Sequence, residues 1–494
     1  MARPVRPPRL RPASSLIPAL IFSALAVGCD APDAHDCNGA AGCGTPEVIE
    51  AVVANGVAAD PGPRALSVNP NLPPALPGAT ASDVALFNAA MAVFNQPFSV
   101  KGTLVTHVNG DHAFTGSGLG PRWNSFSCRE CHGAPVIGGT SFRTNSQAAL
   151  ATGIGTDYGI LAAGQQTPPF LTTNGSSLAA RLKYKPDGSR DGQVHQLFTI
   201  AGRSDAPGCN IAQENWSAQV AANNVAVRIT TPTFGAGLIE ALTDTTILNG
   251  KQGDATTRTA RAGLGIGGHE NRMPDGTVGR FGWKAQTRTL NQFSADAFEH
   301  EMGVTSTAFP TPNDGAASCN FKSGLDDKTL STPAGQMKMT DLVAAGMRLS
   351  APRVAIALSS SATNGKALFG SVGCALCHTP SFTTPSSKTA ALSSKTVALY
   401  SDLLVHHMGA SLADDVIQGG AGPDEFRTAP LWGLGQRFYF MHDGRTADVK
   451  AAILAHAGAA KGTWPASEAN GVVTRFNALT ESQKQDLLNF LRSL

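Results

Sequence analysis

Two copies of one short motif constrain this 494-residue chain more than any other feature of its sequence. Each copy has two cysteines separated by two residues and a histidine directly after the second cysteine, namely Cys128, Cys131 and His132 in the first copy and Cys374, Cys377 and His378 in the second. A structural zinc site needs four ligands, which commonly come from two pairs with a short separation, and a redox dithiol does not need the histidine. Covalent attachment of haem c uses all three residues, because the sulfurs bond to the haem and the histidine ligates its iron. We therefore predict two covalently bound haem c groups.

The N-terminus has the pattern of an export signal. Four arginines lie within residues 1–11, and the apolar run at 16–28 is too short to span a bilayer as a mature helix. The run leads into Ala-Val-Gly-Cys, which resembles a bacterial lipoprotein cleavage site with Cys29 as the lipidated residue; the alternative is an ordinary secretory signal. We predict a signal peptide at 1–28, a flexible tether at 29–78, and an exported protein that is periplasmic or on the cell surface, lipid-anchored at Cys29.

Four of the nine cysteines remain after the two motifs and Cys29 are set aside. An oxidising compartment favours disulfides between them. The simplest pairing joins Cys37 to Cys43 and Cys209 to Cys319, although the sequence alone does not determine connectivity.

Composition and periodicity favour a mostly α fold with long irregular loops. Glycine and proline are frequent, at 53 and 31 residues, and the net charge of +2 gives no reason to expect a nucleic acid partner. Apolar residues recur at helical spacing in several segments, including 76–94 and 479–494, and Thr480 with Gln483 predicts a capping box at the start of the last helix. We place a boundary near 331–336, between an N-terminal haem domain at 79–335 and a C-terminal haem domain at 336–494.

Five longer stretches carry a resemblance to a known family. They lie at residues 118–133, 231–242, 280–306, 400–414 and 426–460, in that order along the chain. The chain resembles the di-haem oxidoreductases sometimes labelled "thiol oxidoreductase-like", which are related to the bacterial di-haem cytochrome c peroxidases and to the di-haem enzyme that matures methylamine dehydrogenase. The resemblance implies two cytochrome c-like domains with one haem each, of which one transfers electrons and the other meets peroxide. It also implies a calcium ion between the domains, held in the relatives largely by backbone carbonyls.

The same resemblance suggests a second ligand for the C-terminal haem. In the peroxidases a methionine about fourteen residues after the histidine of a His-Asp-Gly motif takes this position, and His456 stands there in this chain. We predict that His378 and His456 both ligate haem two, with His442 orienting groups near the haem edge. His406, with Met408 behind it, is the alternative ligand.

Three further residues match positions near the peroxide site of the relatives. The resemblance implies that Trp283 lies between the haems and that Gln292 and Glu301 lie over the peroxide-binding face; Asn291 fits the spacing as well as Gln292. A buried carboxyl near the iron can move a proton between the two peroxide oxygens. Without the resemblance, Glu301 would be expected on a solvated helix face and Trp283 in the core. Glu240, in an apolar run, is a second candidate acid or one half of a buried ion pair.

The relatives that need reductive activation carry a removable histidine soon after the first haem motif. This chain has no histidine from 133 to 194, which predicts that the first iron is open at rest. We predict an enzyme that reduces hydrogen peroxide at the N-terminal haem with electrons passed from the C-terminal haem, and that takes them from a periplasmic donor. The alternatives are a di-haem oxidase of a protein or organic substrate and a non-enzymatic electron-transfer cytochrome.

Overall fold

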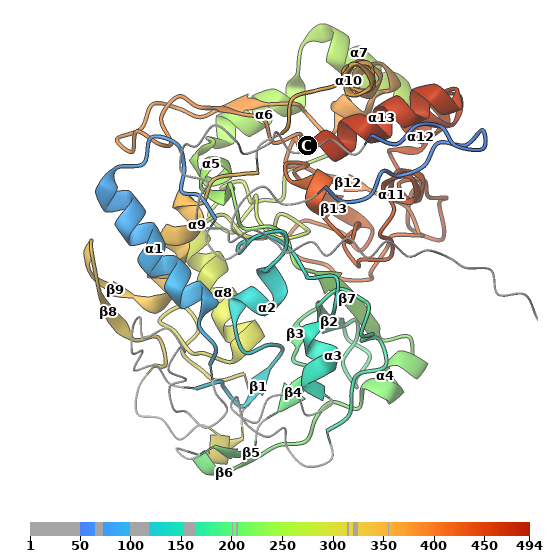
Figure 1. Cartoon of the computed structure of the whole chain (residues 1–494). Coiled ribbons are helices and arrows are strands. Elements are labelled where there is room, and N and C mark those ends of the chain that lie inside the picture. The colour runs from blue at the N-terminus through green and yellow to red at the C-terminus, as the bar shows by residue number, and fades with distance from the viewer. Residues whose placement is uncertain are drawn as a thin grey trace, which may run out of the picture. The chain divides into compact units, whose positions relative to one another are not determined.

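The computed structural model describes residues 50–64, 73–98, 118–151, 165–199, 201–203, 206–313, 316–319, 325–353 and 355–494. Helices are the larger elements among these residues, and every strand is short (Figure 1). The α-helices are α1 (Ala81–Asn95), α2 (Cys128–His132), α3 (Ser146–Ala151), α4 (Trp216–Ala221), α5 (Ala236–Ala241), α6 (Asp244–Gln252), α7 (Ala255–Leu264), α8 (Leu290–Met302), α9 (Met339–Leu349), α10 (Ser360–Val372), α11 (Val449–Ala455), α12 (Asn470–Asn477) and α13 (Glu481–Ser493). The prediction of a helical chain with long irregular segments is confirmed at this level.

The strands form small antiparallel sheets. Their bounds are β1 (Arg122–Trp123), β2 (Leu178–Leu182), β3 (Val194–His195), β4 (Phe198–Thr199), β5 (Ala201–Arg203), β6 (Ala206–Asn210), β7 (Val225–Ile229), β8 (Thr329–Thr332), β9 (Gly335–Lys338), β10 (Phe382–Thr383), β11 (Thr396–Val397), β12 (Val405–His407) and β13 (Glu425–Arg427). Within the described residues the largest sheet has three strands in the order β3-β2-β7, and the others are two-stranded pairs. The hairpin β8–β9 covers the segment in which the sequence predicted a domain boundary.

A first hydrophobic core forms where α1, α8 and α9 pack together (Figure 1). Thr80 and Asp83 form a capping box at the start of α1, and Phe87, Met91 and Phe94 are buried on one face of this helix. The helices α1 and α9 approach closely at Gly346, where an added Cβ would lie 2.5 Å from the Cβ of Ala90. The buried face of α9, which follows the predicted boundary at 335, therefore packs against helices from the N-terminal half.

A second core forms around α10 and α13, which lie side by side (Figure 1). The predicted capping box of Thr480 and Gln483 begins α13, and the leucines of this segment's apolar pattern are all buried, namely Leu487, Leu488, Leu491 and Leu494. A Cβ at Gly365 of α10 would lie 1.9 Å from the carbonyl oxygen of Asp486, so only glycine permits this approach.

Residues 50–64, here called the N-terminal strap, lie along α13. Asp60 forms an ion pair with Arg492 at 2.6 Å, and the guanidinium of Arg64 donates to the carbonyl oxygens of Arg492 and Leu494 at 2.5 and 3.2 Å. These residues belong to the segment at 29–78 that was predicted to be a flexible tether. The sequence of the strap has no helical or strand periodicity. Its order in the structure comes from hydrogen bonds to the end of α13. The predicted signal peptide at 1–28 and Cys29 lie outside the described residues.

Cys209 and Cys319 form a disulfide, as the simplest pairing predicted. It joins β6 to the short 3-10 helix η1 (Ala317–Cys319) across 110 residues of sequence. Cys37 and Cys43 lie outside the described residues. None of the helices in the described residues has both the length and the apolar character that a membrane span requires.

Candidate functional site

The first motif borders a cavity, here called the first cavity, of about 1160 Å³ of empty space that is partly open to solvent. Cys128, Cys131 and His132 all line it, from the short helix α2. His132 directs Nδ1 at the carbonyl oxygen of Gly139, at 3.1 Å, and its ring meets the edge of Phe94. Because a carbonyl can only accept a hydrogen bond, Nδ1 carries the proton and Nε2 keeps its lone pair for a ligand.

One face of α8 forms another wall of the first cavity. Phe293, Ala297 and Glu301 follow one another at four-residue spacing and all line it. Asn124 donates from Nδ2 to the Glu301 carboxylate at 2.7 Å, and its backbone N–H donates to the Glu301 carbonyl at 2.8 Å. Burial raises the pKa of Glu301, while the hydrogen bond from Asn124 acts in the opposite direction. The structure therefore places a buried carboxyl group in the same cavity as the first motif.

Gln292 does not line the first cavity, and here the structure departs from the sequence prediction. It is exposed in the first turn of α8, which begins after the cap residue Thr289. It is one residue before Phe293, the first of the cavity-lining residues that are spaced four apart. Its alternative, Asn291, is also exposed and hydrogen-bonds to Asp341 instead. Gln286, in the turn before α8, is the glutamine that lines the cavity.

Two arginines also line the first cavity. Arg228 is paired with Asp414, to which its Nε donates at 3.0 Å. Arg181 donates from Nη1 to the carbonyl oxygen of Gly192 at 2.6 Å, but its buried Nε has no hydrogen-bond acceptor. Burial lowers the pKa of Arg181 to about 10, so the group is cationic at neutral pH. A buried donor without an acceptor costs free energy unless a ligand satisfies it.

The second motif borders a second cavity, of about 1380 Å³ of empty space, also partly open to solvent. Cys374, Cys377, His378 and His456 line it. The rings of His378 and His456 face each other across it, with their centroids 6.4 Å apart. Two imidazoles on opposite sides of one metal ion, each with a nitrogen about 2.0–2.1 Å from it, have centroids about 6 Å apart. The spacing of the two rings therefore fits a single metal ion between them.

The hydrogen bonds of both rings support this fit. The Nδ1 atom of His378 lies 2.9 Å from the carbonyl oxygen of Tyr400, and that of His456 lies 2.7 Å from the carbonyl oxygen of Ala452. Each ring therefore donates from Nδ1 to a backbone carbonyl and leaves Nε2 free, as His132 does in the first cavity. Metal-ligating histidines in proteins commonly have this arrangement, which fixes the tautomer and the ring orientation.

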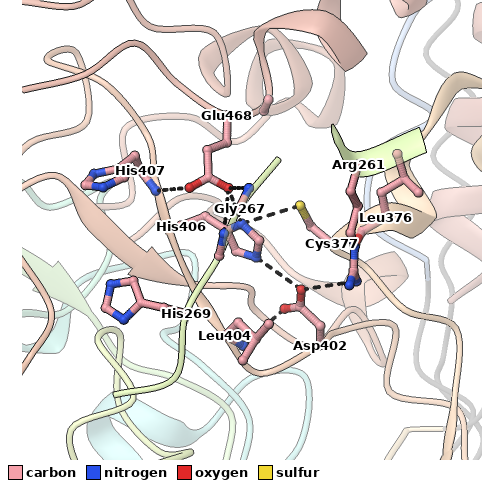
Figure 2. A network of polar contacts seen from close by, with 12 residues as sticks. Arg261, Gly267, His269, Leu376, Cys377, Asp402, Leu404, His406, His407 and Glu468 are labelled. Atoms are coloured by element: carbon pink, nitrogen blue, oxygen red, sulfur yellow. Dashed lines mark hydrogen bonds and ion pairs between the residues drawn. The ribbon is translucent and has the colours of Figure 1, made fainter. Parts of the chain in front are cut away.

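His406, the alternative ligand, is engaged at both ring nitrogens. Its Nε2 lies 3.1 Å from Asp402 Oδ2 and its Nδ1 lies 2.7 Å from Glu468 Oε2 (Figure 2). Its Nδ1 also lies 3.8 Å from the sulfur of Cys377. The nearby carboxylates and the thiol hold the pKa of His406 well above its usual value, although burial opposes this. A ring held between two carboxylates has no free lone pair for an iron ion, so the geometry favours His456 as the ligand.

Two buried arginines, Arg427 and Arg437, line the second cavity. Burial lowers the pKa of each to about 10. Within the part of the chain that the structure describes, neither forms an ion pair with a carboxylate. Unpaired buried cations call for an anionic ligand, and haem carries two propionates. In the first cavity, the buried Nε of Arg181 is likewise a donor without an acceptor. The buried donors of both cavities therefore fit haem.

Trp283 lines both cavities. Its indole Nε1 donates to the carbonyl oxygen of Ile229 at 2.7 Å, which fixes the plane of the ring. His442 lines the second cavity beside it, with ring centroids 6.3 Å apart, and stacks on Phe426 at 4.0 Å. Burial lowers the pKa of His442 to about 4, so this ring is neutral at neutral pH. The predicted tryptophan thus lies between the two motif-bearing cavities.

A family model described as "Di-haem oxidoreductase, putative peroxidase" matches residues 151–494 of this sequence. The chain belongs to the di-haem oxidoreductase family. As a member it is an enzyme of the oxidoreductase class that binds two haems. The match begins after the first motif, which the structure places in a cavity walled largely by residues of the matched region. No curated protein matches the chain.

Several solved structures are similar to this di-haem oxidoreductase. A MauG-like protein associated with microbial copper homeostasis is 17% identical over 53% of this chain and 89% of its own, with a TM-score of 0.27. The di-haem peroxidase BthA from Burkholderia thailandensis is 16% identical over 44% of this chain and 66% of its own, with a TM-score of 0.27. Hydrazine synthase from Kuenenia stuttgartiensis is 15% identical over 33% of this chain and 57% of its own, with a TM-score of 0.21.

Sequence reasoning missed the cationic residues of this di-haem oxidoreductase. Arg181, Arg427 and Arg437 were not predicted as site residues, and neither was Gln286. Arg427 and Arg437 lie inside the 426–460 stretch that carries the family resemblance, so they could have been singled out as charges in an otherwise apolar segment. Glu240, the second candidate acid, forms an ion pair with Arg348 at 2.5 Å and accepts from the backbone of Leu290, which assigns it a structural role at the start of α8.

Proposed function

We propose that this protein reduces hydrogen peroxide at the first cavity with electrons that arrive through the second. The reaction takes two electrons and two protons for each peroxide and yields two water molecules. The observation that carries the proposal is that each motif borders its own cavity and that Trp283 is a wall of both. In this proposal each of the two cores, with its cavity, corresponds to one cytochrome c-like domain.

The chain offers a complete set of attachment groups for each haem. Cys128 and Cys131 would bond covalently to haem one and His132 would ligate its iron. For haem two the corresponding residues would be Cys374, Cys377 and His378, and His456 would be a second ligand of its iron. The bound haem irons supply the electron-accepting centres and, at haem one, a position for peroxide. Among the described residues that line the first cavity, His132 is the only histidine, which supports an open position there.

Glu301 is the residue that we assign to proton movement. Its burial raises its pKa above the ordinary value, which favours the protonated form more than in an exposed glutamate, and the hydrogen bond from Asn124 holds the carboxyl group in place. A positioned carboxyl can deliver a proton to one oxygen of peroxide and recover one from the other. Trp283 provides an aromatic bridge for electrons between the cavities, and the buried arginines neutralise the anionic groups of the haems.

The electron donor and the location are further parts of the proposal. We propose an exported protein, periplasmic or at the cell surface and lipid-anchored at Cys29, that receives electrons from a periplasmic redox partner. The support is the N-terminal sequence pattern and the Cys209–Cys319 disulfide, which is typical of an oxidising compartment.

The test is the Glu301→Gln variant, because the amide keeps the shape of the side chain but cannot exchange a proton in the same way. We expect oxidation of the reduced protein by hydrogen peroxide, followed by stopped-flow absorbance, to slow by about 10²–10⁴-fold. Glu299→Gln, two positions away in the sequence and not lining the first cavity, is the matched control and should react at the parental rate. Both variants should keep two haems after acid-acetone extraction.

An unchanged rate in Glu301→Gln would remove this residue from the reaction. A parent protein that leaves peroxide unreacted and has two low-spin irons would contradict the peroxidase proposal and favour an electron-transfer cytochrome. Loss of haem on extraction would contradict only the proposal that the haems are covalently attached.

A further inference from the structure

We propose that Lys284 is a positioning residue for Trp283, because its ammonium group ties together the segments that hold the indole ring between the two cavities. This inference rests on the proposed function, in which electrons pass from the second cavity to the first by way of Trp283. Lys284 follows Trp283 directly in the sequence, and its side chain has no exposed surface. It lines neither cavity, so it acts through its neighbours.

Three segments of the chain hold Trp283. The first is its own turn, which the bridge between Phe281 and Thr287 closes. The second is β13, from which the backbone N–H of Arg427 donates to the carbonyl oxygen of Trp283 at 2.7 Å. The third is β7, which ends at Ile229, the residue whose carbonyl oxygen accepts from the indole Nε1 at 2.7 Å. The position of the ring therefore depends on how the turn, β13 and β7 are held against one another.

The ammonium of Lys284 joins the turn to β13. Its Nζ donates to the carbonyl oxygens of Gly422 at 2.7 Å and Glu425 at 2.8 Å. It also lies 4.1 Å from the centre of the Phe426 ring, whose negative face attracts a cation. Phe426 lines the second cavity and stacks on His442. The ammonium thus supports this wall of the second cavity from behind.

Asp414 connects the ammonium to β7. Its Oδ1 lies 3.3 Å from Lys284 Nζ, and its Oδ2 accepts from Nε of Arg228 at 3.0 Å. Arg228 belongs to β7 and directly precedes Ile229, which anchors the indole. All three charged side chains are buried, at 5% exposed or less. One carboxylate therefore bridges two cations, and these come from the turn and from the strand that fix Trp283.

Stability alone does not explain this cluster. Two cations and one carboxylate leave a net positive charge in the interior, which costs free energy that an apolar side chain would not cost. Ala285 and Asp415, the residues directly after Lys284 and Asp414, have positive φ angles of 51° and 61°. Such angles are uncommon outside glycine, and they persist where surrounding contacts fix them, often at functional sites.

The charge of Lys284 depends on pH. Burial lowers the pKa of Lys284 to about 8, although Asp414 acts in the opposite direction. The other charged groups that face the ammonium are Arg228, which also lowers this pKa, and Glu425, which raises it. As pH rises through about 8, the ammonium loses its proton and with it the charge that attracts Asp414 and the Phe426 ring. Electron transfer from haem two to haem one should therefore slow above this pH.

The test measures the rate of this electron transfer from about pH 6.5 to about pH 9.5, by rapid reduction of haem two followed by the absorbance change of haem one. Lys284→Met keeps the length of the side chain without its charge. Its rate at neutral pH should fall about tenfold, because a small misplacement of a positioned group has effects of this size, and the rate should not vary with pH. Lys284→Arg stays charged throughout, so it should keep a rate near that of the parent without the decline above pH 8.

Lys183→Met is the matched control. Lys183 is also largely buried and also pairs with an aspartate, Asp415 at 3.5 Å, but it lines neither cavity. This variant should have the rate and the pH profile of the parent. Unchanged absorbance of both haems in all variants shows that they fold.

A second measurement follows the indole itself. Ultraviolet resonance Raman spectroscopy reports the hydrogen bond of a tryptophan N–H, and the signal of Trp283 is assigned by difference from Trp283→Phe. The hydrogen bond to Ile229 should weaken in Lys284→Met and stay unchanged in Lys183→Met. The same weakening should occur in the parent when pH rises above 8.

Four outcomes would overturn the role of Lys284. They are a parental rate that does not change through pH 8, a parental rate in Lys284→Met, equal slowing in Lys183→Met, and slowing in Lys284→Arg as large as in Lys284→Met. Trp283→Phe separates this failure from that of the proposed function. If Trp283→Phe slows the transfer and Lys284→Met does not, only the role of Lys284 is wrong. If Trp283→Phe transfers electrons at the parental rate, the proposed path through Trp283 is wrong.

Discussion

Hydrogen bonds to the ring nitrogens distinguish histidines that can ligate iron from those that cannot. His132, His378 and His456 each donate from Nδ1 to a backbone carbonyl and keep Nε2 free. His406 lies as close to the second motif but has a carboxylate at each ring nitrogen. Side chains of one type in one cavity therefore have different chemistry, because their neighbours fix different protonation states.

The first prediction separates the two candidate ligands of haem two. His456→Ala should lose one low-spin ferric signal and gain a high-spin one, because the iron loses an axial imidazole. His406→Ala should keep the low-spin signal. Electron paramagnetic resonance of the resting protein measures both. A high-spin signal in His406→Ala together with an unchanged spectrum in His456→Ala would reverse the assignment.

The second prediction concerns Glu299, which is buried and has one carboxyl oxygen without a hydrogen-bond partner. Burial raises its pKa to about 7 from an ordinary value of 4.5. Since the folded pKa is the higher one, the stabilisation is complete below about pH 4.5 and is lost as pH rises through about 7. The loss amounts to about 3 kcal/mol at most.

Glu299→Gln should remove this pH dependence, because an amide does not ionise. The variant should gain thermal stability relative to the parent at pH 8 and lose that advantage at pH 5. Thermal unfolding of both proteins at the two pH values is the measurement. A stability difference that does not change with pH would show that Glu299 is ionised in the folded protein or titrates at its ordinary pKa.

At the residue scale, the sequence predicted the cysteines and histidines of the site better than its other polar groups. The motif spacing itself specifies Cys128, Cys131 and His132. Gln292 could not be placed because it depends on where α8 begins, and a shift of one residue turns a helical side chain by about 100°. The arginines were missed because their role depends on the absence of a nearby carboxylate, which only the tertiary structure shows.

At the scale of elements, capping residues predicted where helices begin, whereas the structure of segments without apolar periodicity could not be predicted. The capping box at Thr480 begins α13 as the sequence indicated, and α1 also begins with a capping box, at Thr80. The N-terminal strap could not be found in this way, because it forms neither helix nor extended sheet. Its contacts with α13 come from residues more than four hundred positions away in the sequence, such as Asp60 and Arg492.

The third prediction tests the strap through Asp60, which pairs with Arg492 and also accepts from the backbone N–H of Val449 at the start of α11. Both side chains of the ion pair are nearly inaccessible, at 5% and 2% exposed. Asp60→Ala leaves a buried guanidinium without its carboxylate and should cost about 3–5 kcal/mol of unfolding free energy. Denaturant unfolding followed by absorbance or circular dichroism gives the value.

Two controls make the result specific. Asp187→Ala removes a carboxylate from an exposed turn and should change stability by less than about 0.5 kcal/mol. The double variant Asp60→Ala with Arg492→Met should recover part of the loss, because no unpaired charge remains. A single variant as stable as the parent would contradict a structural role for the strap.

At the scale of the whole described molecule, the two halves of the sequence interleave. The strap, from the N-terminal half, packs with the second core, and α9, from beyond the predicted boundary, packs with the first. Sequence reasoning assigned one haem motif to each half, and each motif does border its own cavity. Spacing along the sequence could not predict the shared wall, because Trp283 belongs to a turn that contacts residues far away in the sequence, Ile229 and His442.

The fourth prediction follows from that shared wall. Trp283 lines both cavities, whereas the buried Trp432 lines neither of them. Trp283→Phe should keep both haems but slow electron transfer between them by about tenfold or more, which corresponds to about 1.4 kcal/mol in the barrier. The smaller ring leaves a gap and lacks the indole N–H that anchors Trp283 to Ile229.

Trp432→Phe is the control and should transfer electrons at the parental rate. The measurement is rapid reduction of haem two followed by the absorbance change of haem one. Equal rates in both variants would mean that electrons bypass Trp283, and slowing in both would indicate a general loosening of the first core.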